Sequence, residues 1–292
     1  MSLKIHFCYD TTPPELLLHI YSKMTPQRSG RWKDMVGVLS PDDADFIIII
    51  DKCKHIANAY PPEKLIYIGS HYKGIPNYQC FDGVPCAASL DLAKDMGFNE
   101  WWINYSYDEL VDMKPAEKTK DLIAIVSDTQ KHTYQKLRKN LIYKICERSD
   151  LIGFFELYGR MRPTGCTPRY HKGPLGENSK TDWMSGKEGV YKAARYALEL
   201  DGGPAINYVS ERFFDALLLW AMPLYWGGTD VEKFFPEKSF QYIDIHGDGS
   251  DAIDIARTDF REQNLEAIAE ARDLILNKYQ IWPTVYRVIK NL

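Results

Sequence analysis

The sequence lacks the features that mark several large classes of protein. It has no excess of positive charge, since 36 lysines and arginines face 40 acidic residues and the formal net charge is −4. No apolar run approaches the roughly 20 residues that cross a bilayer as a helix, and residues 4–9 are typical of a strand rather than a signal peptide. We therefore expect no nucleic acid partner, no transmembrane segment and a cytoplasmic location.

Cysteine and metal-binding patterns are also missing. No short paired spacing links the cysteines, so neither a zinc ribbon nor a disulfide framework is indicated, and we expect most of them to be buried thiols in a reducing compartment. No Asp-X-Asp triplet follows an apolar strand, and residues 244–251 lack the closing glutamate of a calcium loop, so we predict a turn there and no bound metal. The six cysteines are Cys8, Cys53, Cys80, Cys86, Cys146 and Cys166.

The first part of the chain alternates short apolar runs with helical patterns. Strands are predicted at residues 5–9, 46–50 and 65–68, and a helix at residues 14–24. The wholly apolar run at residues 46–50 is typical of a parallel sheet covered on both faces. A polar residue follows each strand, namely Asp10, Asp51 and His71, and would lie at the carboxyl edge of the sheet, where ligands bind in open α/β folds.

A second α/β unit is predicted after the polar, proline-containing residues 114–120. Its elements are a strand at residues 122–126, a helix at 132–147, a strand at 151–158 and a closing helix at 264–279. At 292 residues the chain has room for both units. We predict two Rossmann-like domains, residues 1–117 and 118–292; the strand pattern by itself does not distinguish a transferase from a periplasmic binding protein or a dehydrogenase.

The most informative stretch is residues 207–212, Asn-Tyr-Val-Ser-Glu-Arg, followed by an apolar run and then Pro-Leu-Tyr-Trp-Gly at residues 223–227. Ser210 is a good N-cap, and Glu211 and Arg212 would occupy the first turn of a helix that leads into a buried strand. The free N–H groups and positive dipole of such a turn favour a phosphate, to which Arg212 adds charged donors. This pattern predicts an anion pocket.

These residues resemble the donor-binding motif of the α-1,3-fucosyltransferase family, in which Tyr-Val-Thr-Glu-Lys leads through a helix into Pro-Val-Tyr-Trp-Gly. Serine replaces threonine and arginine replaces lysine here, and both changes keep the type of chemistry. Further matches are residues 158–160, Tyr-Gly-Arg, and residues 235–240. The resemblance covers roughly the last 170 residues well and the first 120 poorly, and it points to the bacterial or viral members, without membrane anchor and stem.

The resemblance implies a GT-B fold, with two Rossmann-like domains facing across a cleft, and specific roles for several residues. Arg212 with Arg160 or Arg162 would hold the donor diphosphate, and Glu211 would accept hydrogen bonds from the ribose. Tyr208 would pack on the base, or alternatively into the core. The other predicted donor-side residues are Arg195, Asp201 and Ser210.

The chain departs from the family at two places. A Phe-Glu-Asn-Ser sequence is replaced by Leu-Asp-Gly-Gly at residues 200–203, which leaves the donor sugar open. The general base of the family is a glutamate, whereas residues 70–77 hold no carboxylate. His71 is therefore our candidate base, with Asp82 or Asp10 behind it, and a capping or surface histidine is the alternative.

The sequence therefore predicts a metal-independent, inverting glycosyltransferase that moves L-fucose from GDP-fucose to a hydroxyl of an oligosaccharide or glycoconjugate, with the GDP-sugar as substrate and no cofactor. One alternative is a transferase that uses another nucleotide sugar, such as a xylosyl donor. Another is a non-catalytic sugar-nucleotide or glycan-binding protein. A dehydrogenase is weakened because no Gly-X-Gly-X-X-Gly follows a predicted strand. Residues 163–186 form a candidate lid.

Overall fold

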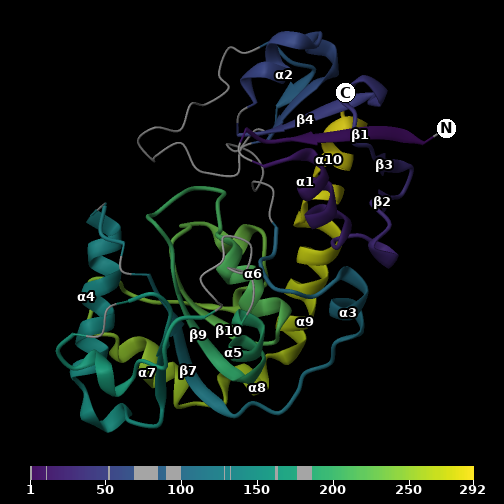
Figure 1. Ribbon diagram of the computed structural model, residues 1–292. Helices are drawn as coiled ribbons and strands as arrows, with labels where there is room; N and C mark the ends of the chain where they lie inside the picture. The colour runs from purple at the N-terminus through teal and green to yellow at the C-terminus, as the bar shows by residue number, and fades with distance from the viewer. Residues whose placement is uncertain are drawn as a thin grey trace.

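Two parallel sheets, one in each half of the chain, form the framework of the computed structural model (Figure 1). The structure describes residues 2–10, 12–51, 53–68, 85–89, 100–127, 129–131, 133–161, 164–175 and 186–292. These two sheets confirm the prediction of two Rossmann-like domains. The predicted boundary at residues 117 and 118 falls between them and stays a prediction.

The first sheet has six strands in the order β2-β3-β1-β4-β5-β6. All neighbours are parallel except β2 and β3. The chain passes from β1 to β3 on one side of β1 and then to β4 on the other, which makes the carboxyl ends of β1 and β4 the topological switch point of this domain. The strands are β1 (Leu3–Cys8), β2 (Arg31–Trp32), β3 (Met35–Gly37), β4 (Phe46–Ile50), β5 (Leu65–Ile68) and β6 (Ala88–Ser89).

Strand β4 shows why an uninterrupted apolar run becomes a central strand. Successive side chains of a strand point to opposite faces of the sheet. Accordingly, Ile48 and Ile50 join the large core that continues into the second domain, whereas Ile47 and Ile49 pack on the other face with Leu65. Both faces of β4 are covered, as the sequence predicts.

The second sheet has five parallel strands in the order β11-β10-β9-β7-β8. These strands are β7 (Lys120–Ile125), β8 (Phe155–Tyr158), β9 (Ala194–Leu200), β10 (Met222–Trp226) and β11 (Gln241–Tyr242). The helices of the two domains are α1 (Pro14–Ser22), α2 (Lys54–Ala59), α3 (Tyr107–Asp112), α4 (Thr133–Glu147), α5 (Lys187–Ala193), α6 (Glu211–Leu218), α7 (Ser250–Ala256), α8 (Phe260–Gln263), α9 (Leu265–Leu274) and α10 (Ile281–Lys290).

The last helix joins the two halves of the molecule. Helix α9 continues through a π-helical turn, Ile275–Tyr279, and α10 then runs beside β1 and α1 of the first domain (Figure 1). The Trp282 indole N–H donates to the Tyr21 carbonyl at 2.9 Å, and its ring meets Phe7 edge-on. The end of the chain therefore belongs to the packing of the first domain.

A polar contact also crosses the junction. The linker between the sheets presents the Trp102 backbone N–H to Asp215 of α6, at 2.8 Å from its Oδ1 atom. Lys187 of α5 lies 3.7 Å from the other oxygen of this carboxylate. Burial raises the pKa of Asp215 to about 7, although Lys187 works in the opposite direction. The buried carboxylate thus ties the linker to α6.

The cysteines differ from the expectation of buried thiols. Cys8, at the end of β1, and Cys53, just before α2, form a disulfide. Cys146 is a buried free thiol, whereas Cys86 and Cys166 are free and only partly buried. The sequence separation of 45 between Cys8 and Cys53 gave no spacing signal, because adjacent parallel strands bring their ends together only in the folded sheet.

None of the helices among the described residues combines the length and apolar character needed to cross a membrane.

We predict that Trp282→Ala lowers the free energy of unfolding by about 3–5 kcal/mol, because it removes a fully buried indole that joins α10 to the first domain. Urea denaturation followed by far-ultraviolet circular dichroism measures the change. Leu292→Ala, at an exposed terminal position, is the control and should be neutral. Equal stability of Trp282→Ala and wild type would contradict the docking of α10.

Candidate active site

The carboxyl edge of the second sheet gathers most of the residues that the sequence singles out. Strand β9 ends at Leu200 and β10 at Trp226, and the two are parallel neighbours. The loop of residues 201–210 leaves this edge and enters α6 at Glu211. Because parallel strands end on the same side of a sheet, the loop and the first turn of α6 lie where ligands bind in open α/β folds.

A buried carboxylate holds this loop in place. Asp201 is 1% exposed, and its side chain accepts hydrogen bonds from the Ser210 hydroxyl, the Ser210 N–H at 3.3 Å and the Tyr225 hydroxyl at 2.6 Å. Burial raises its pKa, whereas Arg212 works in the opposite direction. Asp201 and Ser210 therefore face each other, and neither presents its side chain outward as a predicted donor ligand would.

The predicted cap at Ser210 needs a correction. Ser210 occupies the N-cap position of α6, but its side chain makes no capping hydrogen bond. The hydroxyl donates to Asp201 instead. The first N–H groups of α6 therefore receive no bond from this side chain.

Only glycine fits at the last position of the Pro-Leu-Tyr-Trp-Gly sequence, for a steric reason. A Cβ atom added to Gly227 would lie 2.6 Å from Oδ2 of Asp201 and would also collide with the Tyr225 hydroxyl. The next glycine, Gly228, donates its N–H to that hydroxyl at 2.7 Å. The motif therefore closes the turn after β10 around the buried carboxylate.

Arg212 lies at this edge, as predicted. Its Nη2 donates to the Leu200 carbonyl at 2.8 Å and lies 3.8 Å from Asp201, with the side chain 16% exposed. Burial lowers the pKa of the guanidinium, but the nearby carboxylates of Glu211, Glu199 and Asp201 outweigh burial and raise it above the usual value. Arg212 therefore keeps its charge in a largely buried setting.

A second arginine, which the sequence analysis missed, reaches the same carbonyl. Arg138 of α4 is 6% exposed, and its Nη1 donates to the Leu200 oxygen at 3.1 Å. Its Nε has no hydrogen-bond partner within the described part of the chain. Burial and, after it, the charge of Arg212 lower the pKa of Arg138 to about 10. Two guanidinium groups therefore converge on one backbone oxygen.

The sequence does carry a signal for Arg138. It shares the buried face of α4 with Leu141, Ile142 and Ile145, at the helical spacing of an apolar stripe. A charged residue in such a stripe is rarely buried without a partner. That rule would have marked Arg138 for attention.

Glu199, one residue before the end of β9, is a buried acid that interacts electrostatically with Arg212. It is 1% exposed and accepts a hydrogen bond from the Tyr191 hydroxyl at 2.7 Å. Burial raises its pKa to about 8, even though Arg212 works in the opposite direction. Burial therefore weakens the negative charge that Glu199 can hold beside Arg212 near neutral pH.

Glu211 and Tyr208 lie on the side of this site that meets the first domain. Both are half-buried. Burial raises the pKa of Tyr208, and the charges that raise it further include Asp51 of the first sheet. Glu211 raises the pKa of Glu100, which lies on the linker and which burial brings to about 7. Tyr208 and Glu211 thus interact electrostatically with charged groups of the first domain and the linker.

Arg160 lies at the same sheet edge but in a separate depression. It is exposed and lines an open pocket of about 540 Å³ together with residues of the loop after β7, namely Ser127, Thr129, Gln130 and Lys131. Gly159 precedes it with a φ of +107°, and a Cβ there would collide with the Val126 carbonyl. The backbone conformation at this position therefore explains the glycine of the Tyr-Gly-Arg sequence. Arg162 lies outside the described residues.

Arg195 lies at the wrong end of its strand for the predicted role. It is the second residue of β9, at the amino edge, whereas Leu200 ends the strand at the carboxyl edge. Its guanidinium pairs with Glu262 at 2.7 Å, Asp259 at 3.1 Å and Asp121 at 3.3 Å. The structure thus gives Arg195 a structural ion-pair cluster and removes it from the candidate donor site.

Three further expectations concern segments around the site. The turn at residues 244–251 is confirmed, because Asp251 accepts from the Asp244 N–H at 2.7 Å and Asp248 from the Ser250 N–H at 2.9 Å. The described part of the candidate lid, residues 164–175, is held against β8, where the Leu157 N–H donates to the Tyr170 carbonyl. His71 and Asp82 lie outside the described residues.

Comparison with known proteins gives similarity in fold. No family model and no curated protein matches the sequence. An α1,3-fucosyltransferase crystal structure has 17% identity and a TM-score of 0.48, with 92% of this chain and 81% of that chain covered. The DNA-modifying enzyme β-glucosyltransferase has 14% identity and a TM-score of 0.49, with 99% and 100% covered.

A third similar structure is TarM of S. aureus, with 9% identity and a TM-score of 0.49, covering 84% of this chain and 55% of that one. At such identities and TM-scores the likeness concerns the course of the chain. It does not specify a donor or an acceptor for this protein.

We predict that Glu199→Gln flattens the dependence of stability on pH. The pKa of Glu199 is raised in the folded state, so its contribution is complete below the usual value near 4.5 and is lost as pH rises through about 8. The glutamine variant stays neutral and should lose less stability over this range. Melting temperatures of both proteins between about pH 5 and about pH 9 measure the difference.

Glu63→Gln, at an exposed position of the first domain, is the matched control and should follow the wild-type profile. Parallel profiles for wild type and Glu199→Gln would show that Glu199 is ionised in the folded protein across this range.

Proposed function

We propose that this protein is an inverting glycosyltransferase that takes a sugar from a nucleoside diphosphate donor and transfers it to a hydroxyl of an oligosaccharide or glycoconjugate. GDP-fucose is the proposed donor, because the Tyr-Val-Ser-Glu-Arg run of residues 208–212 resembles the donor-binding motif of α-1,3-fucosyltransferases. No cofactor or metal is required in this proposal.

The observation that carries the proposal is the convergence of Arg138 and Arg212 on the Leu200 carbonyl. The donating nitrogens lie within about 6 Å of each other, and two positive charges at that distance repel by roughly 3 kcal/mol at an effective dielectric constant near 20. A diphosphate between them would turn this repulsion into two attractions. The buried Nε of Arg138 supplies a further donor with no partner among the described residues.

Such a site suits the chemistry of sugar transfer. When the bond between the sugar and the diphosphate breaks, the leaving group gains negative charge, and fixed cations stabilise that charge without reorganisation. The first turn of α6 has no side-chain cap, and it adds backbone N–H groups and the positive end of the helix dipole. Arg138 and Arg212 thus offer the neutralisation that other transferases obtain from a metal ion.

The remaining roles concern the nucleoside and the acceptor. We assign Glu211 to the ribose hydroxyls, because a carboxylate accepts from two adjacent hydroxyls and no hydrogen bond to it occurs within the described ranges. Tyr208 is assigned to the base. Arg160, in its exposed pocket, remains a candidate for the outer phosphate. His71 remains the proposed base that takes the proton from the acceptor hydroxyl.

The alternatives make different predictions in one experiment. The protein is incubated with radiolabelled GDP-fucose and a panel of oligosaccharides, and with other nucleotide sugars in parallel. Transfer from GDP-fucose supports the proposal. Transfer only from another donor, such as a xylosyl nucleotide, would change the donor assignment, while GDP binding without turnover of any donor would identify a non-catalytic binding protein.

We predict that Arg212→Ala lowers kcat about 10²-fold to 10³-fold, because it removes charge stabilisation of the leaving diphosphate. Arg138→Gln should act in the same direction. Initial-rate kinetics measure the effect, with Arg257→Ala, an exposed arginine of the same domain, as the control. Both variants need a wild-type circular dichroism spectrum; full activity of a folded Arg212→Ala protein would refute its assigned role.

We predict that His71→Ala lowers kcat by at least about 10²-fold and leaves GDP binding unchanged, because a general base acts on the acceptor and not on the donor. Single-turnover assays together with calorimetric titration of GDP separate the two effects. Unchanged turnover would show that His71 is not the general base and would leave Asp82 or Asp10 as candidates. His19→Ala, in α1, is the histidine control.

A further inference from the structure

Three metal-ligating side chains, Asp10, Cys53 and His55, cluster at the carboxyl edge of the first sheet, and Cys8 is disulfide-bonded to one of them. Cys8 ends β1 and Asp10 follows it, while Cys53 and His55 lie at the start of α2, after β4. Strands β1 and β4 are parallel neighbours, with Cys8 opposite Ile49. Residues far apart in sequence are therefore brought together at the switch point of the sheet.

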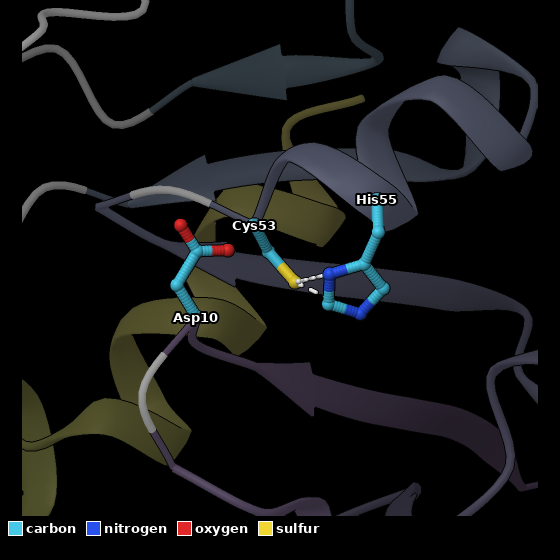
Figure 2. Close-up of side chains that lie close together, drawn as sticks. All are labelled: Asp10, Cys53 and His55. Atoms are coloured by element: carbon cyan, nitrogen blue, oxygen red, sulfur yellow. Dashed lines mark hydrogen bonds between the residues drawn. The ribbon is translucent and has the colours of Figure 1, made fainter.

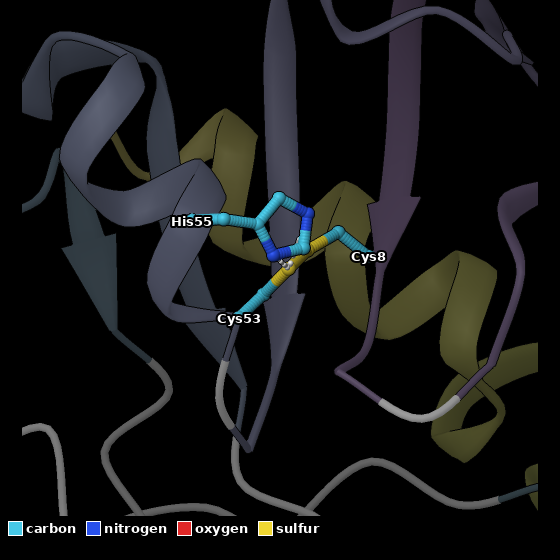
Figure 3. The surroundings of a disulfide bond; sticks show 3 residues. All are labelled: Cys8, Cys53 and His55. Carbon is cyan, nitrogen blue, oxygen red and sulfur yellow. Dashed lines mark hydrogen bonds between the residues drawn. A yellow bond between two sulfur atoms is a disulfide. The ribbon is translucent and has the colours of Figure 1, made fainter.

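The ligand atoms are close to one another. Atoms of Asp10, Cys53 and His55 all lie within 4.8 Å of one another, and the Cys53 sulfur is 3.6 Å from a ring nitrogen of His55 (Figure 2). Cys8 is disulfide-bonded to Cys53, with a Cα–Cα distance of 6.4 Å, and both sulfurs lie beside the His55 ring (Figure 3). The donor set is two sulfurs, one imidazole nitrogen and one carboxylate.

This donor set matches the preference of Zn²⁺, which binds four such ligands as a tetrahedron. Zinc bond lengths of about 2.0–2.3 Å put tetrahedral ligand atoms roughly 3.3–3.8 Å apart, so the ligand atoms of Asp10, Cys53 and His55 would move about 1 Å closer together, and the two sulfurs would separate after reduction. The burial pattern allows those shifts. Cys8 and Cys53 are 4% and 3% exposed, whereas Asp10 and His55 are exposed and can move toward the sulfurs.

We propose that the chain, with its thiols reduced, binds one Zn²⁺ through Cys8, Asp10, Cys53 and His55. This reverses the expectation of no metal site, and it does not depend on the proposed transferase activity. The ion would clamp the loop after β1 to the start of α2, a helix of six residues that has no side-chain cap. Its effect is therefore on the stability of this edge of the first domain.

The disulfide and the zinc site exclude each other. An added phosphine or dithiol supplies two electrons, water or the dithiol supplies two protons, and the Cys8–Cys53 bond becomes two thiols while the phosphine is oxidised to its oxide or the dithiol to a disulfide. Zinc binding then displaces the two thiol protons and forms two zinc–thiolate bonds. Re-forming the disulfide requires release of the zinc and removal of two electrons by an added oxidant.

The test uses the full chain reduced with a phosphine, dialysed against excess Zn²⁺ and then against metal-free buffer. Mass spectrometry of the metal content should give one zinc per chain, and Co²⁺ in its place should show the thiolate charge-transfer band and the visible bands of a tetrahedral site. Cys53→Ser should lose the metal, while Cys166→Ser, at a partly buried position of the second domain, should keep it.

Asp10→Asn and His55→Ala guard against variants that fail to fold, because both positions are exposed. Each should weaken zinc binding by at least about 10-fold, which is the loss found even when a residue that only hydrogen-bonds to a zinc ligand is replaced. Zinc should also raise the melting temperature of the reduced wild type and leave the disulfide form unchanged. No retained metal in the reduced wild type, or equal retention by Cys53→Ser, would overturn the proposal.

Discussion

The carboxyl edge of the second sheet depends on the hydrogen bonds that the Leu200 carbonyl, at the end of β9, accepts from two arginines. Arg138 from α4 and Arg212 from α6 both donate to it, so two helices from different parts of the chain are fixed to the same strand end. Asp201, the next residue, fixes the loop that leads into α6. The same contacts that build this edge therefore also concentrate positive charge there, which is why the geometry favours an anionic ligand.

The buried acids set the strength of that charge. Asp201 is hydrogen-bonded on both oxygens, whereas burial raises the pKa of Glu199 to about 8 and so weakens its charge near neutral pH. Glu211 lies half-buried toward the domain junction, where it also affects Glu100. A diphosphate would restore the balance of charge. The first domain carries a different chemistry at its own edge, with soft ligands rather than arginines, so the two sheet edges are suited to different ligands.

Local sequence signals predicted the elements whose burial is uniform. Residues 46–50 and 65–68 became β4 and β5 with the predicted bounds, because a wholly apolar run has one stable place in a covered parallel sheet. The prediction for Arg195 was wrong because strand β9 was not recognised in the sequence. Without the bounds and direction of that strand, Arg195 could not be assigned to the amino or the carboxyl edge of the sheet. Arg138 and the Cys8–Cys53 pair were missed because their partners are distant in sequence and meet only through the strand order. Contacts of this kind follow from the tertiary structure and cannot be predicted from local sequence.

The most direct test of the central claim is a double-mutant cycle for GDP binding, measured by calorimetry on wild type, Arg138→Gln, Arg212→Gln and the double variant. If both guanidinium groups hold one diphosphate, GDP binds wild type far more tightly than guanosine does, each single change weakens GDP binding, and the two losses are not additive. Equal affinity of wild type for GDP and guanosine, or GDP binding that neither substitution changes, would contradict the shared anion site.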